Sequence, residues 1–327
     1  MENKIIPNHN VLKYYFYFIQ ERMNIFWRKC LKYSINDATQ DSILKEFKFT
    51  NVYRASDRVS QYLINMVIYG EIKHNREEDL LLQIIVFKIF NKISTWEFLK
   101  NAYGDISIDH FDVEIISKLL TERQVSFPIF NNAYMMTGSH HKYNHLNTKH
   151  EKWLSMVKKE ILDAKLLSKI VHAHDLSDVF NLLNQCSFLG PFLSYQYAID
   201  LNYSPVLNFN ENSFVKAGIG AIRGIKKCFL FYGDHYEDAI FYIQNNFEEL
   251  QQKYGYSTFR ELPGRMPTLI DLQNCFCETD KYLRMAMPEL HIGNKRIKQR
   301  YLPSNAPIKY KFPPKWHINL DKKLCIL

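Results

Sequence analysis

The chain has 327 residues, of which 46% are hydrophobic and 23% are charged. These ordinary globular values exclude a disordered, collagen-like or low-complexity chain, and the length allows a large core to form without disulfides or a structural metal. The net charge is +8, from 42 Lys and Arg against 34 Asp and Glu. Residues 291–327 carry nine of those basic residues and one acid, while the preceding 290 residues hold 33 charges of each sign. The basic excess therefore belongs to the C-terminal tail.

The apolar runs are too short to span a bilayer, which needs roughly 18–20 residues. Six cysteines are scattered along the chain without a CxxC pair. This usage fits reduced thiols better than a disulfide framework or a metal cluster. The first residues show no signal-peptide pattern. We therefore expect a cytoplasmic protein without a membrane segment, and the basic tail favours a polyanionic partner.

Apolar residues recur at intervals of three and four along almost the whole chain, which is typical of helices. The stretches with this spacing are 12–31, 52–66, 80–99, 111–120, 153–167, 189–201, 219–231, 240–250 and 269–283. The stretch 80–99 is apolar almost all round and indicates a central helix. Thr268 and Asp271 form a capping-box pattern that predicts the start of a helix. No stretch alternates with a period of two, so the sequence predicts an all-α protein of about ten helices.

The segment 49–63 carries the first candidate constellation. Asn51 is placed to cap a helix, on which Arg54, Asp57, Arg58 and Gln61 would share one polar face. One interpretation is a solvated, salt-bridged face. The other is a row of hydrogen-bonding groups that face a phosphate or a base.

Two glycine-containing turns form the second candidate. The Gly190-Pro191 turn lies between two apolar stretches and could expose backbone N–H groups to a DNA phosphate. Gly218 and Gly220 precede Arg223, Lys226 and Lys227, which together predict an anion-binding helix start or a plain helix with a basic flank. Neither turn has the setting of a Rossmann fingerprint or a P-loop.

The segment 271–285 is the third candidate. Glu278 and Lys281 share one helix face, and Asp280 and Arg284 lie four residues apart beside them. These groups could provide an acid, a base or an electrostatic stabiliser. They could equally form two salt bridges within the helix.

The segment 137–150 is polar and rich in histidine, and we interpret it as a loop rather than as a metal site. We expect no metal and no cofactor. The tail from 291 to 327 contains four prolines and should be extended, either as a phosphate-binding arm or as a strap over the fold. We divide the chain into a catalytic domain over 1–290 and this tail.

The order of these motifs is more specific than any one of them. FTNVYRASDRVSQYLI (49–64), IFNNAYMM (129–136), GPFLSYQYAIDLNYS (190–204), AGIGAIRGIKK (217–227) and FCETDKYLR (276–284) follow one another in the chain. Over roughly residues 12–286, the chain resembles the family of α-glutamyl/putrescinyl thymine pyrophosphorylases and hydroxymethyluracil DNA kinase helical domains. This family is similar to helix-hairpin-helix DNA glycosylases.

The resemblance implies a two-lobed, helix-hairpin-helix glycosylase-like fold with a cleft for a flipped nucleotide. It also implies chemistry at a modified base in DNA. Separately, we expect a monomer whose partner is double-stranded phage DNA with modified bases. The chain departs from the family where Ala217-Gly218-Ile219-Gly220 replaces a Gly-Pro-Gly form and where Thr279 replaces an apolar residue. The glycosylase parallel also singles out Glu211, which follows Gly190 by 21 residues.

From these observations we expect two sets of site residues. The catalytic candidates are Asp280, Glu211, Glu278 and Lys281. The DNA-binding candidates are Arg54, Asp57, Arg58, Gly190, Gly218, Gly220, Arg223, Lys226, Lys227 and Arg284.

The leading hypothesis is a DNA glycosylase that flips out a modified pyrimidine of phage DNA and leaves an abasic site, as anti-phage defence. Asp280 or Glu211 would stabilise the sugar cation, and Lys281 could instead attack C1′. The second hypothesis is a base-hypermodification transferase that displaces pyrophosphate from an activated hydroxymethyluracil. The third is a DNA-binding module without catalysis. The chain has no P-loop motif, so it is not expected to phosphorylate the base itself.

Overall fold

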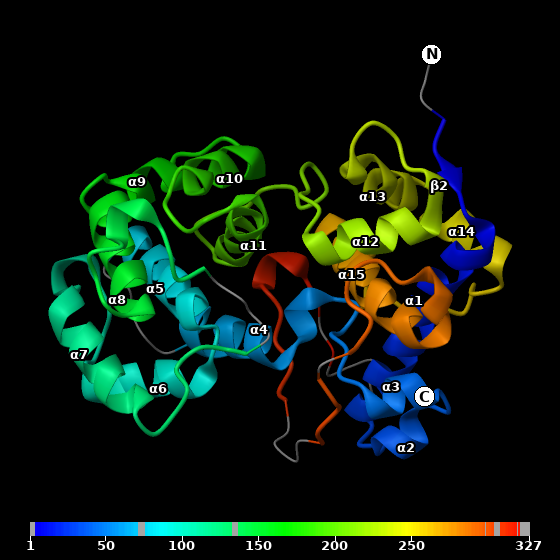
Figure 1. The fold of residues 1–327 in the computed structure, drawn as a ribbon, viewed down its shortest axis with the longest axis horizontal. Helices are drawn as coiled ribbons and strands as arrows, with labels where there is room; N and C mark the ends of the chain where they lie inside the picture. Colours follow the sequence, from blue (N-terminus) through cyan, green and yellow to red (C-terminus); the bar gives the residue numbers. More distant parts are fainter. Residues whose placement is uncertain are drawn as a thin grey trace. The chain divides into compact units, whose positions relative to one another are not determined.

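The computed structural model describes residues 4–70, 76–132, 137–297, 299–303, 308–318 and 320. The described residues are mostly helical, which confirms the predicted class at that level (Figure 1). The chain divides into two compact units, which are described separately below. Unit 1 comprises Met1–Asp57 and Phe214–Leu327, and unit 2 comprises Arg58–Ser213. Among the described helices, none is long and apolar enough to cross a membrane.

Unit 1 is built around α15 (Leu269–Ala286), which is buried on most of its circumference. Its start is fixed by the predicted capping box, because Thr268 and Asp271 bond reciprocally to each other's backbone. The remaining elements of unit 1 are β1 (Ile6–Pro7), α1 (His9–Cys30), α2 (Ile35–Ala38), α3 (Ser42–Glu46), η1 (Arg54–Ser56), α12 (Ile219–Cys228), β2 (Phe229–Phe231), α13 (Tyr236–Asn245), α14 (Phe247–Tyr254), η6 (Pro288–Leu290) and η7 (Pro314–Trp316). Helices α1, α12 and α13 pack directly on α15 (Figure 1).

Two glycines let α12 approach α15 closely. A Cβ on Gly220 would lie 2.2 Å from Cys277 Sγ, and one on Gly224 would lie 2.2 Å from the Phe276 carbonyl oxygen. Since Arg223 and Lys227 lie on the same face of α12 as these glycines, the close packing carries both basic side chains to α15.

Gly224→Ala is therefore expected to destabilise the protein by about 1–3 kcal/mol, because the new methyl group meets backbone that cannot move aside cheaply. Gly138→Ala is the matched control, since its Cβ would have ordinary contacts with Lys149, and its effect should stay within about 0.5 kcal/mol. Chemical denaturation measures both variants. Equal unfolding midpoints for the two would contradict the packing role of Gly224.

Unit 2 surrounds α5 (Glu77–Phe90), in which every residue from Asp79 to Phe90 is buried. Lys88 on this helix forms a buried ion pair with Asp200, with Nζ and Oδ2 2.9 Å apart. The other elements of unit 2 are α4 (Arg58–Tyr62), η2 (Leu63–Ile68), α6 (Ile93–Ala102), η3 (Ile108–His110), α7 (Val113–Gln124), η4 (His141–Tyr143), α8 (Lys149–Met156), η5 (Val157–Leu162), α9 (Leu166–Val171), α10 (Leu176–Asn184) and α11 (Pro191–Asn202).

Five predicted helical stretches are wrong in their extent. Two of them cross a break: 153–167 crosses the turn that precedes α9, and 240–250 spans the end of α13 and the start of α14. The other three are as follows. The stretch 80–99 is two helices, because Asn91 takes a left-handed conformation with φ of 47° and ends α5. The stretch from Asn51 is interrupted at Asp57, whose extended backbone separates η1 from α4. The stretch 219–231 is helical only to Cys228, and β2 follows it and pairs with β1 in an antiparallel ladder.

The described parts of the tail pack against other segments of unit 1. The backbone N–H of Tyr301 donates to the Glu46 carbonyl (2.8 Å), and the Lys48 N–H donates to the Gln299 carbonyl (3.1 Å). Phe312 is buried, and the Arg265 guanidinium lies 3.4 Å from the ring centre of Trp316. These contacts favour a strap over a free arm. Lys298 and residues 321–327 of the tail, and residues 133–136 of the IFNNAYMM motif, lie outside the described residues.

Candidate functional site

A buried carboxylate surrounded by three cations forms the centre of the candidate site in unit 1. Asp280 is fully buried on α15. Its Oδ1 lies 2.9 Å from Lys227 Nζ, and its Oδ2 lies 3.2 Å from Arg223 Nε and also accepts from Arg284 Nη2. Arg223 and Lys227 are four residues apart on α12, and Arg284 is four residues after Asp280. The cluster therefore carries two more positive charges than negative ones.

The three cations fix the charge of Asp280. Burial alone would raise the pKa of this carboxyl, but hydrogen bonds from Arg284 and Lys227 outweigh it and hold the pKa below its ordinary value. Asp280 is accordingly an anion at neutral pH. Lys227 is almost completely buried, whereas the Arg223 side chain is 20% exposed and Lys226 beside it is exposed. The accessible edge of the cluster is thus cationic and suits a phosphate.

A second carboxylate, Glu278, lies two residues before Asp280 on α15 and belongs to a different network, because residues two apart lie on nearly opposite sides of a helix. Its Oε2 accepts from the Thr50 backbone N–H (2.9 Å) and lies 2.7 Å from Lys281 Nζ. Lys281 also donates to the Lys48 carbonyl (2.7 Å) and lies over the Phe49 ring. Both i,i+3 and i,i+4 salt bridges that the sequence allowed on α15 are therefore present, and Lys281 is held by several partners.

Asp57 and Arg22 complete this side of unit 1. Arg22, on α1, donates to the Thr50 carbonyl (3.0 Å) and to Asn51 Oδ1 (2.8 Å), and the Asn51 N–H donates to Asp57 Oδ1 (2.9 Å). Among the residues that the structure describes, Asp57 Oδ2 receives no hydrogen bond. Burial raises the pKa of Asp57 to about 7, although the Asn51 N–H and the charge of Arg22 oppose this. Asp57 is therefore suited to exchange a proton near neutral pH.

The raised pKa predicts a pH-dependent stability. The contribution of Asp57 is fully present below its ordinary pKa of about 3.9 and is lost as the pH rises through about 7. Asn at this position still accepts the Asn51 N–H but does not ionise. The free energy of unfolding of the native protein minus that of Asp57→Asn should therefore fall as the pH rises from 4 to 8. Denaturation curves at each pH measure the difference, and parallel profiles would contradict the raised pKa.

The other predicted residues are divided between the units. In unit 1, the N–H of Arg54 donates to Asp271 Oδ1 (2.8 Å), and Gly218 is the N-cap of α12. In unit 2, Arg58 is the first residue of α4, Gly190 is the N-cap of α11, and Glu211 is buried. The structure therefore gathers Asp57, Arg223, Lys227, Glu278, Asp280, Lys281 and Arg284 in unit 1. Catalysis and DNA binding by all of these residues stay predictions. The same holds for DNA binding by Gly220, which faces α15.

Comparison with known proteins decides the family. The family model described as "5-hmdU DNA kinase, helical domain" matches residues 9–292. The chain belongs to this family. It is 22% identical over 285 residues to a curated protein from Bacillus phage SP10 named 5-hmdU DNA kinase. The matched region covers 82% of this chain but only 44% of that relative, so the chain spans less than half of the relative's length. No solved structure matches the chain.

Membership of the 5-hmdU DNA kinase helical-domain family overturns the leading hypothesis from the sequence. The predicted DNA glycosylase, and with it the hydrolytic excision of a base, is wrong, because both matches point to a kinase family, which is a class of transferases. The resemblance to the hydroxymethyluracil DNA kinase helical domains is confirmed. The glycosylase-like helix-hairpin-helix fold is not shown by any matching structure.

The place of Arg22 in the site and the pairing of Asp280 with residues of α12 were not predicted from the sequence. Arg22 lies 29 residues before Asn51, on a helix that otherwise reads as core, so spacing gave no sign of their contact. The spacing of Gly220, Arg223, Gly224 and Lys227 at i, i+3, i+4 and i+7 was the available signal for a shared face. Among the described residues, no three His, Cys, Asp or Glu side chains form a group that could hold a metal ion.

Proposed function

We propose that the chain engages DNA containing 5-hydroxymethyluracil and serves a group transfer to the hydroxymethyl group of that base. The observation that carries this proposal is the family match over residues 9–292, together with the name of the relative from phage SP10. The cationic edge formed by Arg223 and Lys226 supplies a binding surface for the DNA backbone.

The assignment of the cluster follows from its charges. Asp280 is ion-paired with three cations and kept ionised, so its role is to orient Arg223 and Arg284 rather than to transfer a proton. Asp57 has an oxygen without a partner among the described residues and a pKa near neutrality. We assign proton transfer during the reaction to Asp57.

Displacement of pyrophosphate by an amine is the second candidate. The 327 residues contain no P-loop sequence, which favours a step that consumes an activated base over one that uses a nucleoside triphosphate held by such a loop. In this step the amine nitrogen bonds to the 5-methylene carbon, the bond from that carbon to oxygen breaks, and pyrophosphate leaves with the electron pair. The nitrogen loses a proton, which Asp57 could accept.

The test compares three duplexes that differ only at the base: thymine, 5-hydroxymethyluracil and its pyrophosphorylated form. Binding should be tighter to one of the modified duplexes than to the thymine duplex. Nucleoside analysis by mass spectrometry after incubation with an amine, or with ATP, identifies the transfer. Equal binding to all three duplexes, together with unchanged bases, would contradict the proposal.

A further inference from the structure

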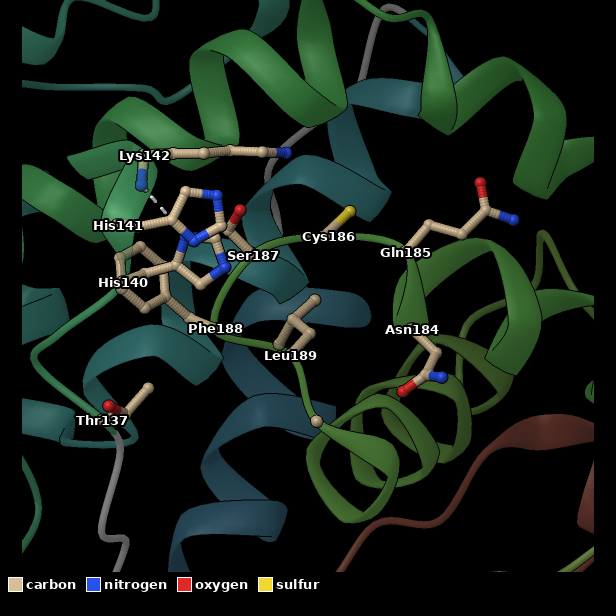
Figure 2. A pocket seen from close by; sticks show the side chains of 11 residues that line it. Thr137, His140, His141, Lys142, Asn184, Gln185, Cys186, Ser187, Phe188 and Leu189 are labelled. Atoms are coloured by element: carbon tan, nitrogen blue, oxygen red, sulfur yellow. Dashed lines mark hydrogen bonds between the residues drawn. The ribbon is translucent and has the colours of Figure 1, made fainter.

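Unit 2 contains an open pocket of about 500 Å³ that the proposed reaction does not use. The turn η4 and the residue before it supply His140, His141 and Lys142, and the loop between α10 and α11 supplies Ser187 and Phe188. Figure 2 shows the two imidazoles beside Ser187 and Phe188, with Asn184 and Gln185 on the other side of the pocket. The volume is in the range of small-ligand sites.

Glu160 joins the two walls of this pocket. Its carboxylate accepts from the Ser187 N–H (2.6 Å), Ser187 Oγ (2.7 Å) and Tyr143 OH (2.9 Å), and it lies 3.3 Å from Lys142 Nζ. Burial would raise the pKa of Glu160, but these hydrogen bonds outweigh it and lower the pKa. Glu160 lies on η5, a short π-helical segment. Such segments are rare in proteins, and those that occur are often found at functional sites.

The loop between α10 and α11, which forms one side of the pocket, has an unusual backbone conformation at Phe188. Phe188 has a φ of 70°, which a residue with a bulky side chain seldom adopts. Its ring stacks on Trp153 at 5.1 Å and meets the edge of His140 at 5.4 Å. The packing of Phe188 therefore stabilises a loop shape that its own backbone disfavours, and that shape forms one side of the pocket.

The side of the pocket formed by His140 and His141 offers hydrogen-bond donors. The rings of His140 and His141 stack with centroids 4.4 Å apart. His140 Nδ1 accepts the Lys142 backbone N–H (3.4 Å), so a neutral His140 ring carries its proton on Nε2. Glu160, which contacts Lys142 and Ser187 of the lining, is already occupied by four donors. The lining thus supplies N–H groups and the ammonium of Lys142, which Glu160 contacts from outside the lining, and the described residues of the lining itself include no carboxylate. This set of groups favours an anionic ligand.

We propose that this pocket binds a phosphate group, with His140, His141 and Lys142 as the contacts and Glu160 as the positioning residue. A compact anion with several acceptor oxygens can take donors from all three side chains at once. The phosphate could be part of a free pyrophosphate or nucleotide, or a phosphodiester of the DNA backbone. The site lies wholly in unit 2 and does not depend on the reaction proposed above.

Titration calorimetry with inorganic pyrophosphate, and fluorescence anisotropy with an unmodified DNA duplex, test the site and separate the two sources. The double variant His140→Ala, His141→Ala should weaken the binding of one probe by at least about tenfold, the size expected for loss of one charge-assisted contact or more. The matched control is His145→Ala, an exposed histidine of the same segment that does not line the pocket.

Loss of pyrophosphate binding alone assigns the site to a free or terminal phosphate, and loss of DNA binding assigns it to the backbone. Unchanged affinity of the double variant for both probes would overturn the proposal. Glu160→Gln tests the positioning role, and Ser187→Ala replaces it if Glu160→Gln does not fold. Either should weaken the same probe while the NMR signals of the histidine rings still report a folded chain. Unchanged affinity would show that Glu160 serves stability alone.

Discussion

Asp280→Asn should lower the free energy of unfolding by about 3–5 kcal/mol, which is the usual cost of breaking a buried ion pair. The substitution leaves Lys227, whose side chain is 2% exposed, without its compensating charge. Arg284 loses the same partner. Chemical denaturation of both proteins at pH 7 measures the effect.

Two further variants identify the cause of that loss. Glu46→Gln, which breaks an exposed ion pair with Arg300, should cost less than about 1 kcal/mol. Lys227→Met combined with Asp280→Leu should restore much of the stability lost in Asp280→Leu, because the buried charge is then removed with its partner. If the double variant is no more stable than Asp280→Leu, the buried charge of Lys227 is not the cause of the lost stability.

The contribution of Asp280 to the free energy of unfolding is also expected to depend on pH. Because the pKa of Asp280 in the folded chain lies below its ordinary value, its contribution is present above about pH 4 and is lost as the pH falls through the folded pKa. The difference in the free energy of unfolding between the native protein and Asp280→Asn should therefore become smaller at acidic pH. Asp57→Asn behaves in the opposite sense, so the two variants distinguish a carboxylate stabilised by cations from one disfavoured by burial.

The second large effect concerns DNA affinity. Arg223→Gln combined with Lys226→Gln should weaken DNA binding about a hundredfold at low salt, because two charge-assisted contacts to phosphate are lost. The slope of log affinity against log salt concentration should become shallower by about two. Asp280 keeps Lys227 and Arg284 as partners in this variant, so the fold should persist.

The control for this prediction removes the same charge elsewhere in unit 1. Lys13→Gln with Lys253→Gln changes exposed residues of α1 and α14. Anisotropy titrations at several salt concentrations should show a small change of affinity for this pair. A loss equal to that of the Arg223 and Lys226 variant would show that net charge, rather than the cluster edge, controls binding.

Local patterns predicted much of the helical structure and the motifs of α15. The capping box at Thr268 and the Asp280–Arg284 pair depend on residues three and four apart, so spacing alone predicts them. The break at Asn91 was missed because a left-handed asparagine leaves no apolar gap in the pattern. The interruption at Asp57 was missed because its polar neighbours kept a helical spacing.

Contacts between distant segments could not be predicted from the sequence. Asp280 meets Arg223 across 57 residues only because Gly220 and Gly224 bring two helices together. The unit 2 pocket is lined by His140 and Ser187, and Glu160 accepts a hydrogen bond from Ser187, but no single motif contains these three residues. The transferase class was among the alternatives that the sequence allowed, and the family match rather than the residue pattern favoured it.

We propose that the chain serves group transfer on hydroxymethylated DNA and leaves the base attached to its sugar. The most direct test incubates it with DNA in which 5-hydroxymethyluracil replaces thymine, and then measures nucleosides, free bases and abasic sites by mass spectrometry. We expect tighter binding than to thymine DNA, no free base and no abasic sites. Release of the modified base, or equal binding to both DNAs together with unchanged nucleosides, would contradict this proposal.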